Sequence, residues 1–318
     1  MIVCVTLNPC LDKTLCVGPW RPGDHVRGRS VREVVGGKGN NVARALTRLG
    51  HVARPATILG GDIGRRCERL LRGDDGLDPI VAPSAAETRV ILTVRAVDGA
   101  EPTAFFDPDP AVTAEEAAAL LNMVEGTLAV GGVEALTLSG SSPSPATHDI
   151  YADMIALARS RGVPTFLDTY GPPLKHLWGF WPEVIQLNRR EAAGHLGVDD
   201  PSDAEVFGLL GEWSRRGVEL AVVTDGPGPV LAASRGRRLV ARPPAIEAVN
   251  PVGSGDSMLA GLVDGRLSGL DGAGMLRRGI AAAAANALAW DAGAVDPGLV
   301  ASLEAGVAVR AFADGEPS

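Results

Sequence analysis

The chain has 318 residues, of which 46% are hydrophobic and 21% charged, and its formal net charge is −8. This length and composition allow one large domain with an appendage to bury a sizeable core. The acidic balance argues against nucleic-acid binding, because nucleic-acid binders present a basic face. The longest run of small apolar residues, Gly279 to Trp290, is too short to cross a bilayer, so we expect no membrane partner.

At the start of the chain, Met1–Leu7 is apolar, short and without a basic leader, which predicts a buried strand and not a signal peptide. We therefore expect a cytoplasmic protein. The four cysteines form no C-x-x-C pair, and without a secretory context they are better interpreted as reduced thiols than as a disulfide or zinc framework.

The first helical pattern, Asn40–Leu49, follows the loop Gly36-Gly37-Lys38-Gly39. These glycines do not follow the G-x-G-x-x-G dinucleotide pattern, and a P-loop would need Ser or Thr after the lysine. Small residues around Lys38 would let a ligand approach the backbone closely. Asn41 adds an amide that can both donate to and accept from sugar hydroxyls.

Strand-like and helical patterns alternate along the rest of the chain, which is typical of a parallel sheet wrapped by helices. The capping box Thr113-x-x-Glu116 predicts a helix that runs to Thr127. The alanine-rich segment Asp271–Trp290 predicts a buried helix. The runs that predict strands are Met1–Leu7, Arg54–Leu59, Ala135–Leu138, Pro164–Leu167, Val184–Leu187 and Leu220–Thr224.

Two segments interrupt this alternation. One lies near residues 13–35, and the other, Thr88–Phe106, contains an extended run from Arg89 to Val94 with a turn expected at Gly99.

The most informative motif is Gly253-Ser254-Gly255-Asp256, which lies where an apolar helical pattern begins. Glycines permit backbone conformations in which successive N–H groups face an anion, and the positive end of the helix dipole reinforces them. A carboxylate beside such a cradle can accept a proton from a hydroxyl that attacks a nucleotide's terminal phosphate. The same motif is also a common turn in which the aspartate only caps the helix.

Taken together, these motifs resemble the carbohydrate kinases of the ribokinase-like, PfkB-type family, within it the branch of 1-phosphofructokinase and tagatose-6-phosphate kinase. The resemblance implies an α/β fold, a three-layer αβα sandwich around a mainly parallel sheet with a small β-sheet lid. It also implies one kinase domain over residues 1–318, with lid segments at approximately 13–35 and 86–108. The motifs occur in the family's order: Thr6 to Asp12, Gly36 to Leu49, Thr88-Arg89, Ser139-Gly140-Ser141, Asn188-x-x-Glu191, Thr224-Asp225-Gly226 and Gly253 to Asp256.

The resemblance also implies a role for each site residue. Asp256 is the expected general base, with an anion hole from Gly253, Ser254 and Gly255. The expected partners of Mg²⁺ and phosphate include Glu191, acting on the metal through water. The sugar phosphate is expected to contact Asp12, Arg27, Gly37, Lys38, Gly39, Asn41, Arg89 and Ser139. ATP is expected to contact Asn188, Glu191, Thr224, Gly226, Gly228 and Asn286.

Each role has a structural alternative. Asp12 can be a turn aspartate, and Arg27, Lys38 and Arg89 can be solvated surface cations. Asn188 and Glu191 also have the spacing of a helix-capping pair. Asn286 can be a helix-packing amide.

The implied activity is ATP- and Mg²⁺-dependent phosphorylation of fructose 1-phosphate or tagatose 6-phosphate, in a protein that forms a homodimer through the lid. A kinase of an unphosphorylated sugar or nucleoside would share Asp256 but would not need Arg89. A catalytically silent sugar-phosphate sensor would explain why Gln186 replaces the lysine of the family's Lys-Pro-Asn, unless Arg189 or Arg190 supplies that charge. Pro229 and Pro251 are further departures from the family pattern.

Overall fold

The computed structural model describes residues 1–97 and 102–312, and within them a central sheet of 10 strands. The turn expected at Gly99 lies outside the described residues. In spatial order the strands are β14 (Ala308–Ala311), β13 (Arg237–Arg242), β12 (Val230–Ser234), β11 (Leu220–Thr224), β10 (Val184–Asn188), β9 (Thr165–Asp168), β8 (Ala135–Ser139), β1 (Ile2–Thr6), β4 (Ala53–Gly60) and β5 (Ile80–Ser84).

The sheet is parallel from β5 to β11, and β12, β13 and β14 continue it in antiparallel pairing. β1 lies between β4 and β8, and all five of its residues are buried. Both faces of this strand are covered, so its sequence is an apolar run and does not alternate with polar residues.

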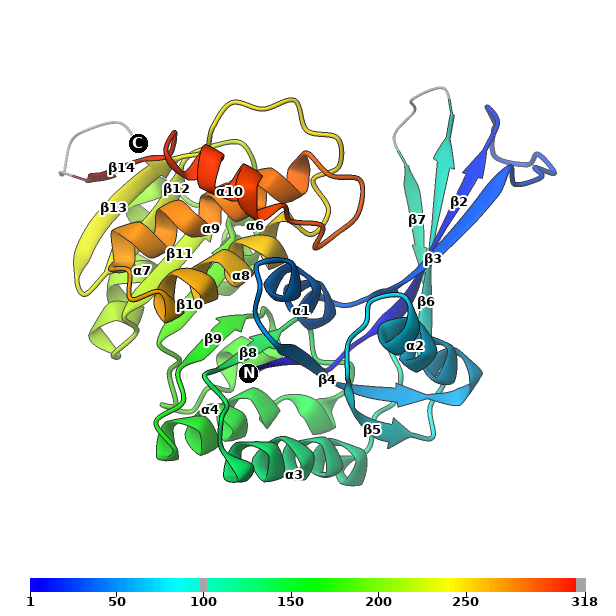
Figure 1. Ribbon diagram of the computed structural model, residues 1–318, viewed down its shortest axis with the longest axis horizontal. Coiled ribbons are helices and arrows are strands. Elements are labelled where there is room, and N and C mark those ends of the chain that lie inside the picture. The colour runs from blue at the N-terminus through cyan, green and yellow to red at the C-terminus, as the bar shows by residue number, and fades with distance from the viewer. Residues whose placement is uncertain (98–101, 313–318) are drawn as a thin grey trace.

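Helices cover both faces of the sheet and complete three layers (Figure 1). One face packs against α3 (Ala114–Val130), α4 (Ile150–Ser160), α6 (Arg189–Leu196) and α7 (Asp203–Arg215). The other packs against α1 (Lys38–Arg48), α2 (Gly61–Gly73), α8 (Ser254–Leu267), α9 (Gly272–Ala287) and α10 (Pro297–Glu304). The short α5 (Pro172–Lys175) follows β9 and precedes β10 along the chain.

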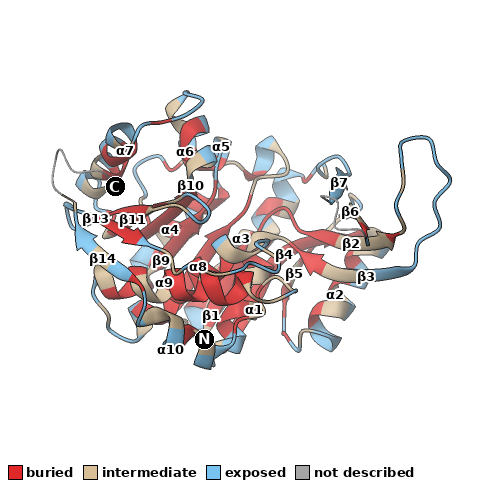
Figure 2. Cartoon of the chain, turned by 90° about the horizontal axis from the view of Figure 1, so that it is seen from above, coloured by how far each residue is buried: buried red, intermediate tan, exposed pale blue. Residues whose placement is uncertain are grey.

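A second sheet of 4 strands projects from one end of the molecule (Figure 1). Its order is β3 (Ser30–Gly36), β2 (Cys10–Val17), β6 (Arg89–Ala96) and β7 (Thr103–Phe106). The connection between β2 and β3 is exposed over most of its length (Figure 2). The small sheet contacts the loop after α9 through Arg32, which pairs with Asp291 at 2.6 Å, and Arg95, which lies 4.3 Å from the ring centroid of Trp290.

The six predicted strands are present, and the capping box at Thr113 forms as expected. The helix that it starts runs to Val130, beyond the predicted Thr127, and ends at two glycines with positive φ. α9 ends at Ala287, before the predicted Trp290, because the chain turns there toward Gly293. Four strands lacked a recognised pattern: β5, β12, β13 and β14. No helix in the described part of the chain has the length and apolar character to cross a membrane.

Candidate active site

The carboxyl ends of the parallel strands bring the polar motifs together at one edge of the central sheet. β8 ends at Ser139, β9 at Asp168, β10 at Asn188 and β11 at Thr224. These residues are far apart in the sequence, but parallel pairing places the strand ends side by side. Ligands of open α/β sheets bind at this edge.

The glycine loop before α8 has the geometry of an anion cradle. Gly253 caps the helix with φ 81°, a left-handed conformation, and a Cβ there would lie 2.6 Å from Cβ of Ala292. Both the backbone and the available space therefore require glycine at this position. The next amides lie in the first turn of α8, where N–H groups lack helical partners. Gly255 does not have a positive φ, so the expectation that both glycines need special backbone freedom holds for Gly253 alone.

Asp256 lies in the first turn of α8 and is 7% exposed. Its Oδ2 accepts a hydrogen bond of 2.7 Å from Nδ2 of Asn41, on α1. Burial, and after it the nearby Asp168 carboxylate, raise the pKa of Asp256 to about 7. The Lys38 ammonium and the Asn41 hydrogen bond oppose this rise. A carboxyl group with a pKa near neutrality suits proton transfer.

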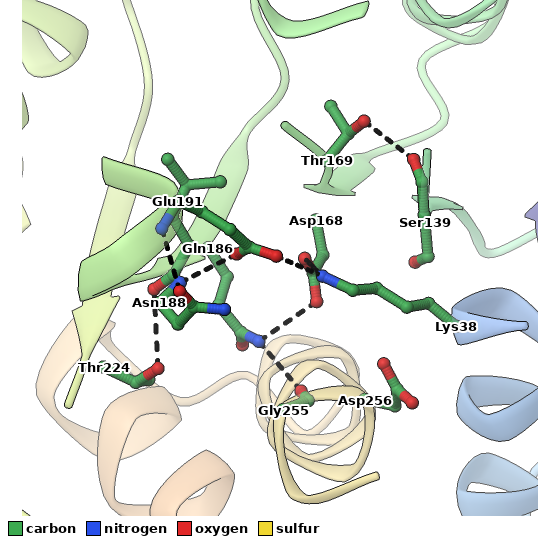
Figure 3. A network of polar contacts seen from close by, with 12 residues as sticks. Lys38, Ser139, Asp168, Thr169, Gln186, Asn188, Glu191, Thr224, Gly255 and Asp256 are labelled. Carbon is green, nitrogen blue, oxygen red and sulfur yellow. Dashed lines mark hydrogen bonds and ion pairs between the residues drawn. The ribbon is translucent and has the colours of Figure 1, made fainter. Parts of the chain in front are cut away.

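Lys38 links the end of β9 to the first turn of α6 (Figure 3). Its Nζ lies 2.7 Å from Oδ1 of Asp168 and 2.8 Å from Oε1 of Glu191. Burial opposes a charge on Lys38, but these two carboxylates outweigh it and hold the pKa of the lysine above its ordinary value. Lys38 is therefore an ion-paired residue of the site and not a solvated loop cation.

Asp168 is the main site residue that sequence reasoning missed. It directly follows the predicted strand Pro164–Leu167 and is 2% exposed. Ligands of open α/β sheets bind at the carboxyl ends of parallel strands. An aspartate directly after each predicted strand is therefore a signal that would have found Asp168.

The departure at Gln186 does not leave this edge of the sheet without a cation. Gln186 is buried, and its Nε2 donates to the carbonyl oxygen of Gly255 at 2.8 Å and to Oδ2 of Asp168 at 3.4 Å. The ammonium of Lys38 contacts the other oxygen of that aspartate. Arg189, one candidate replacement for the missing charge, pairs instead with Asp203 and Asp225, and Arg190 is exposed.

Asn188 and Glu191 form a capping box, as the structural alternative predicted. Oδ1 of Asn188 accepts from the Glu191 amide, and Oε2 of Glu191 accepts from the Asn188 amide, both at 2.9 Å. Capping uses only one oxygen of Glu191, and the other contacts Lys38. The capping geometry therefore holds the glutamate in the site. A metal contact of Glu191 stays a prediction.

The remaining nucleotide-side residues fall into two groups. Thr224, Gly226 and Gly228 lie at the end of β11 and in the turn that follows it, on the same edge as Asn188. Asn286 is instead fully buried: Oδ1 accepts from Ser257 and Gly293, and Nδ2 donates to Val252 and Ser254. Both the oxygen and the nitrogen of the Asn286 amide are therefore hydrogen-bonded within the protein, and the nitrogen holds the loop before α8. A direct nucleotide contact of Asn286 stays a prediction.

On the sugar side, Asp12 and Arg89 lie at the base of the small sheet. Asp12 borders a hollow of about 810 Å³, together with Asn41 and Arg44. Burial raises the pKa of Asp12, and Arg44 and Arg89 oppose the rise. Arg89 donates to Asp109 at 2.7 Å, while its buried Nε has no hydrogen-bond partner among the described residues.

Of three other residues expected on the sugar side, two have structural roles. Gly37 starts α1 with φ 111°. A Cβ on Gly39 would lie 2.3 Å from the carbonyl oxygen of Val5, so this glycine lets α1 pack against β1. Ser139 is fully buried, and its Oγ has no partner among the described residues. Ligand contacts of these residues stay predictions.

Arg27 is not brought near the other sugar-side residues by the register of the small sheet. It is exposed in the connection between β2 and β3, beyond the pair Cys16–Ser30. Arg89 pairs with Cys10, at the opposite end of β2. Within one subunit the two arginines therefore lie at opposite ends of the small sheet.

The charge cluster predicts opposite shifts of the Asp256 pKa in two variants. Asp168→Asn removes a negative neighbour and should lower that pKa below its native value of about 7, whereas Lys38→Met removes a positive neighbour and should raise it. Carboxyl ¹³C NMR titration of the native protein and both variants measures the shifts. Equal shifts in one direction would contradict the assigned electrostatics.

Comparisons with known proteins agree with this fold. Residues 5–296 match the model of the pfkB family carbohydrate kinases. A structure described as a possible 1-phosphofructokinase from Thermotoga maritima is 24% identical, covers 98% of this chain and 100% of its own, and has a TM-score of 0.87. The tetrameric inhibited form of phosphofructokinase-2 from Escherichia coli is 24% identical over 96% of this chain and 98% of its own, with a TM-score of 0.85.

A more distant structure, Arabidopsis thaliana ribokinase complexed with ribose and ATP, is 18% identical over 95% of this chain and 98% of its own. Its TM-score of 0.73 confirms the predicted ribokinase-like fold. The family match covers most of the chain, so the chain belongs to the pfkB family of carbohydrate kinases and is an ATP-dependent sugar kinase.

Proposed function

We propose that the protein phosphorylates a phosphorylated ketohexose, fructose 1-phosphate or tagatose 6-phosphate, to the bisphosphate with ATP and Mg²⁺. The observation that carries the proposal is Asp256, buried at the positive end of α8 beside the Gly253 loop, with a pKa near neutrality. A silent sensor would not need an acid with this pKa at an anion cradle.

The proposed reaction uses the groups at this edge of the sheet. The acceptor hydroxyl oxygen forms a bond to the γ-phosphorus of ATP while its proton passes to the Asp256 carboxylate. The bond from that phosphorus to the β–γ bridging oxygen breaks, and ADP leaves with the electron pair. First-turn amides of α8 stabilise the charge on the transferring phosphoryl group.

The acidic residues near Lys38 fit a divalent cation. With Asp256 ionised, it and the carboxylates of Asp168 and Glu191 carry three negative charges against the one ammonium, an excess that Mg²⁺ would balance. Asp168 and Glu191 would hold the metal, which would supply positive charge to neutralise the nucleotide phosphates. Among the described residues no group of three or more His, Cys, Asp or Glu could hold a metal alone.

The phosphorylated substrate is favoured by Arg89. This guanidinium is 15% exposed, close to Asp12, and has a free buried Nε. A phosphate can accept from such a planar fork at two positions. An unphosphorylated sugar would leave this buried group without an anionic partner other than Asp109.

We also propose that the small sheet forms a homodimer with its copy in a second subunit. Phe105 and Phe106 on the edge strand β7 are 54% and 64% exposed, and Val31 on the opposite edge strand is 54% exposed. Exposed apolar side chains on a sheet with open edges favour pairing with another chain. Such pairing would bring Arg27, at the tip of the small sheet, toward the sugar side of the candidate site in the second subunit.

Asp256→Asn should lower kcat by about two to four orders of magnitude, the scale of a lost general base, with the KM for ATP little changed.

The same variant should also change stability. The pKa of Asp256 is raised in the folded state, so its ionisation destabilises the fold increasingly as pH rises toward 8. The variant should therefore resist urea better than the native protein at pH 8, and less so at pH 4. Coupled ADP release and urea unfolding measure both, with the exposed Asp62→Asn as control. Undiminished turnover would remove Asp256 from the mechanism.

Arg89→Ala should raise the KM for the sugar phosphate strongly and leave the KM for ATP nearly unchanged, because binding to a remote phosphate is lost. The assay is coupled ADP release over a panel of sugars and sugar phosphates, with the exposed Arg65→Ala as the matched control. Faster turnover of unphosphorylated sugars than of sugar phosphates by the native protein would contradict the substrate assignment.

Phe106→Ser should convert the dimer to a monomer, because it places a hydroxyl where we expect an apolar interface. Sedimentation equilibrium of the native protein and the variant measures the change. Phe180→Ser, outside the small sheet and 43% exposed, is the matched control. A native monomer, or a dimer that survives Phe106→Ser and dissociates with Phe180→Ser, would overturn the proposed interface.

A further inference from the structure

Arg44 lies one helical turn after Asn41 on α1 and is held by acceptors from three parts of the chain. Its Nη1 donates to Oδ1 of Asn41 at 2.8 Å. Its Nη2 donates to the carbonyl oxygen of Val35 at 2.6 Å and to Oδ2 of Asp75 at 2.7 Å. The Arg44 and Asp75 side chains are only 13% and 20% exposed. The guanidinium therefore has a fixed position between β3, α1 and the end of α2.

This position determines how the Asn41 amide can be oriented. A guanidinium can only donate, so the amide atom that faces Arg44 must be the oxygen. An ionised carboxylate can only accept, so the amide atom that faces Asp256 must be the nitrogen. One orientation satisfies both neighbours, and it gives the 2.7 Å hydrogen bond from Asn41 to Asp256.

The surrounding packing leaves little freedom for this turn of α1. A Cβ on Gly293, in the loop after α9, would lie 2.8 Å from the carbonyl oxygen of Asn41 and 2.9 Å from Cβ of Arg44. The loop thus packs closely against the turn that carries both residues. Arg44 and Asn41 cannot move away from each other here without displacing it.

We propose that Arg44, anchored by Asp75, is a positioning residue that fixes the amide orientation of Asn41 and thereby the carboxylate of Asp256. The inference rests on the proposed role of Asp256 as the base. The hydrogen bonds of Arg44 go to Asn41, Val35 and Asp75, so it acts on Asp256 through Asn41.

The charged groups around Asp256 give the expected direction of the effect. Besides its burial, the carboxylate is influenced by Asp168 on β9, Lys38 at the start of α1 and Glu191 on α6. The Asn41 hydrogen bond lowers the pKa of Asp256 against that burial. Without Arg44 the amide can invert and present its oxygen to the carboxylate, which destabilises the ionised form. The pKa of the base should then rise.

The first test compares Arg44→Met with Arg48→Met, which removes an equal charge from the exposed last turn of the same helix. Arg44→Met should lower kcat by about ten- to a hundredfold, the scale of a misplaced catalytic group. The acidic limb of its kcat/KM profile should move to higher pH, and the KM for ATP should stay unchanged. Arg48→Met should match the native protein in all three.

The second test separates positioning from a general structural role. In an Asn41→Ala background, Arg44→Met should cause no further loss of kcat and no further shift of the pH profile, because Arg44 acts through that amide. Arg44→Lys keeps the charge but lacks the fork, and should give an intermediate loss. Asp75→Asn should reproduce part of the Arg44→Met effect, so these two variants carry the test if Arg44→Met does not fold.

Additive losses in the Asn41→Ala background, or an unshifted pH profile in a folded Arg44 variant, would overturn the inference. Asp256→Asn distinguishes this failure from failure of the proposed function. Where Asp256→Asn abolishes turnover and Arg44→Met behaves like Arg48→Met, only the positioning role is wrong. Where Asp256→Asn has no effect, the proposed base itself is wrong.

Discussion

The site depends on one balance of buried charge. Asp256, Asp168 and Glu191 are carboxyl groups from three elements, and Lys38 supplies an ammonium to two of them. Burial and the neighbouring carboxylate raise the pKa of Asp256 to about 7, so its ionisation destabilises the folded chain by on the order of 4 kcal/mol. Lys38 and the Asn41 amide limit that cost. A base with a pKa near neutrality can therefore exist in this site only because α1 places both groups beside α8.

Local signals in the sequence predicted most of the fold and the center of the site. Gly253 and Asp256 were identified because a glycine that permits positive φ and the start of a helical pattern lie within four residues of each other. The capping box at Thr113 and the buried run of β1 are local in the same way. The β12–β13 hairpin was missed, although Arg235 and Gly236 both have positive φ, because an arginine is an unusual residue in such a turn.

What the sequence could not supply was the pairing of distant residues and the reason for each glycine. The contact of Asn41 with Asp256 joins residues 215 apart, and no local pattern encodes it. Gly39 was expected to admit a ligand, and the structure adds a packing reason for this glycine, because a side chain there would collide with the backbone of Val5. Asn286 was expected at the nucleotide, and the structure adds hydrogen bonds through which it holds the loop before α8. Small or polar residues suit a ligand contact and also suit close packing within the protein. Only the structure shows which packing contacts such a residue makes.

The loop after α9 connects the small sheet to α8. Its residues Trp290 and Asp291 contact Arg95 and Arg32 of the small sheet, and Gly293 donates to Oδ1 of Asn286. The same amide holds Val252 and Ser254, next to the cradle. A displacement of the small sheet thus has a continuous path of contacts to the Gly253 loop. Gln186 adds a second connection to α8, because its Nε2 donates to the carbonyl oxygen of Gly255 and so ties β10 to the first turn of that helix.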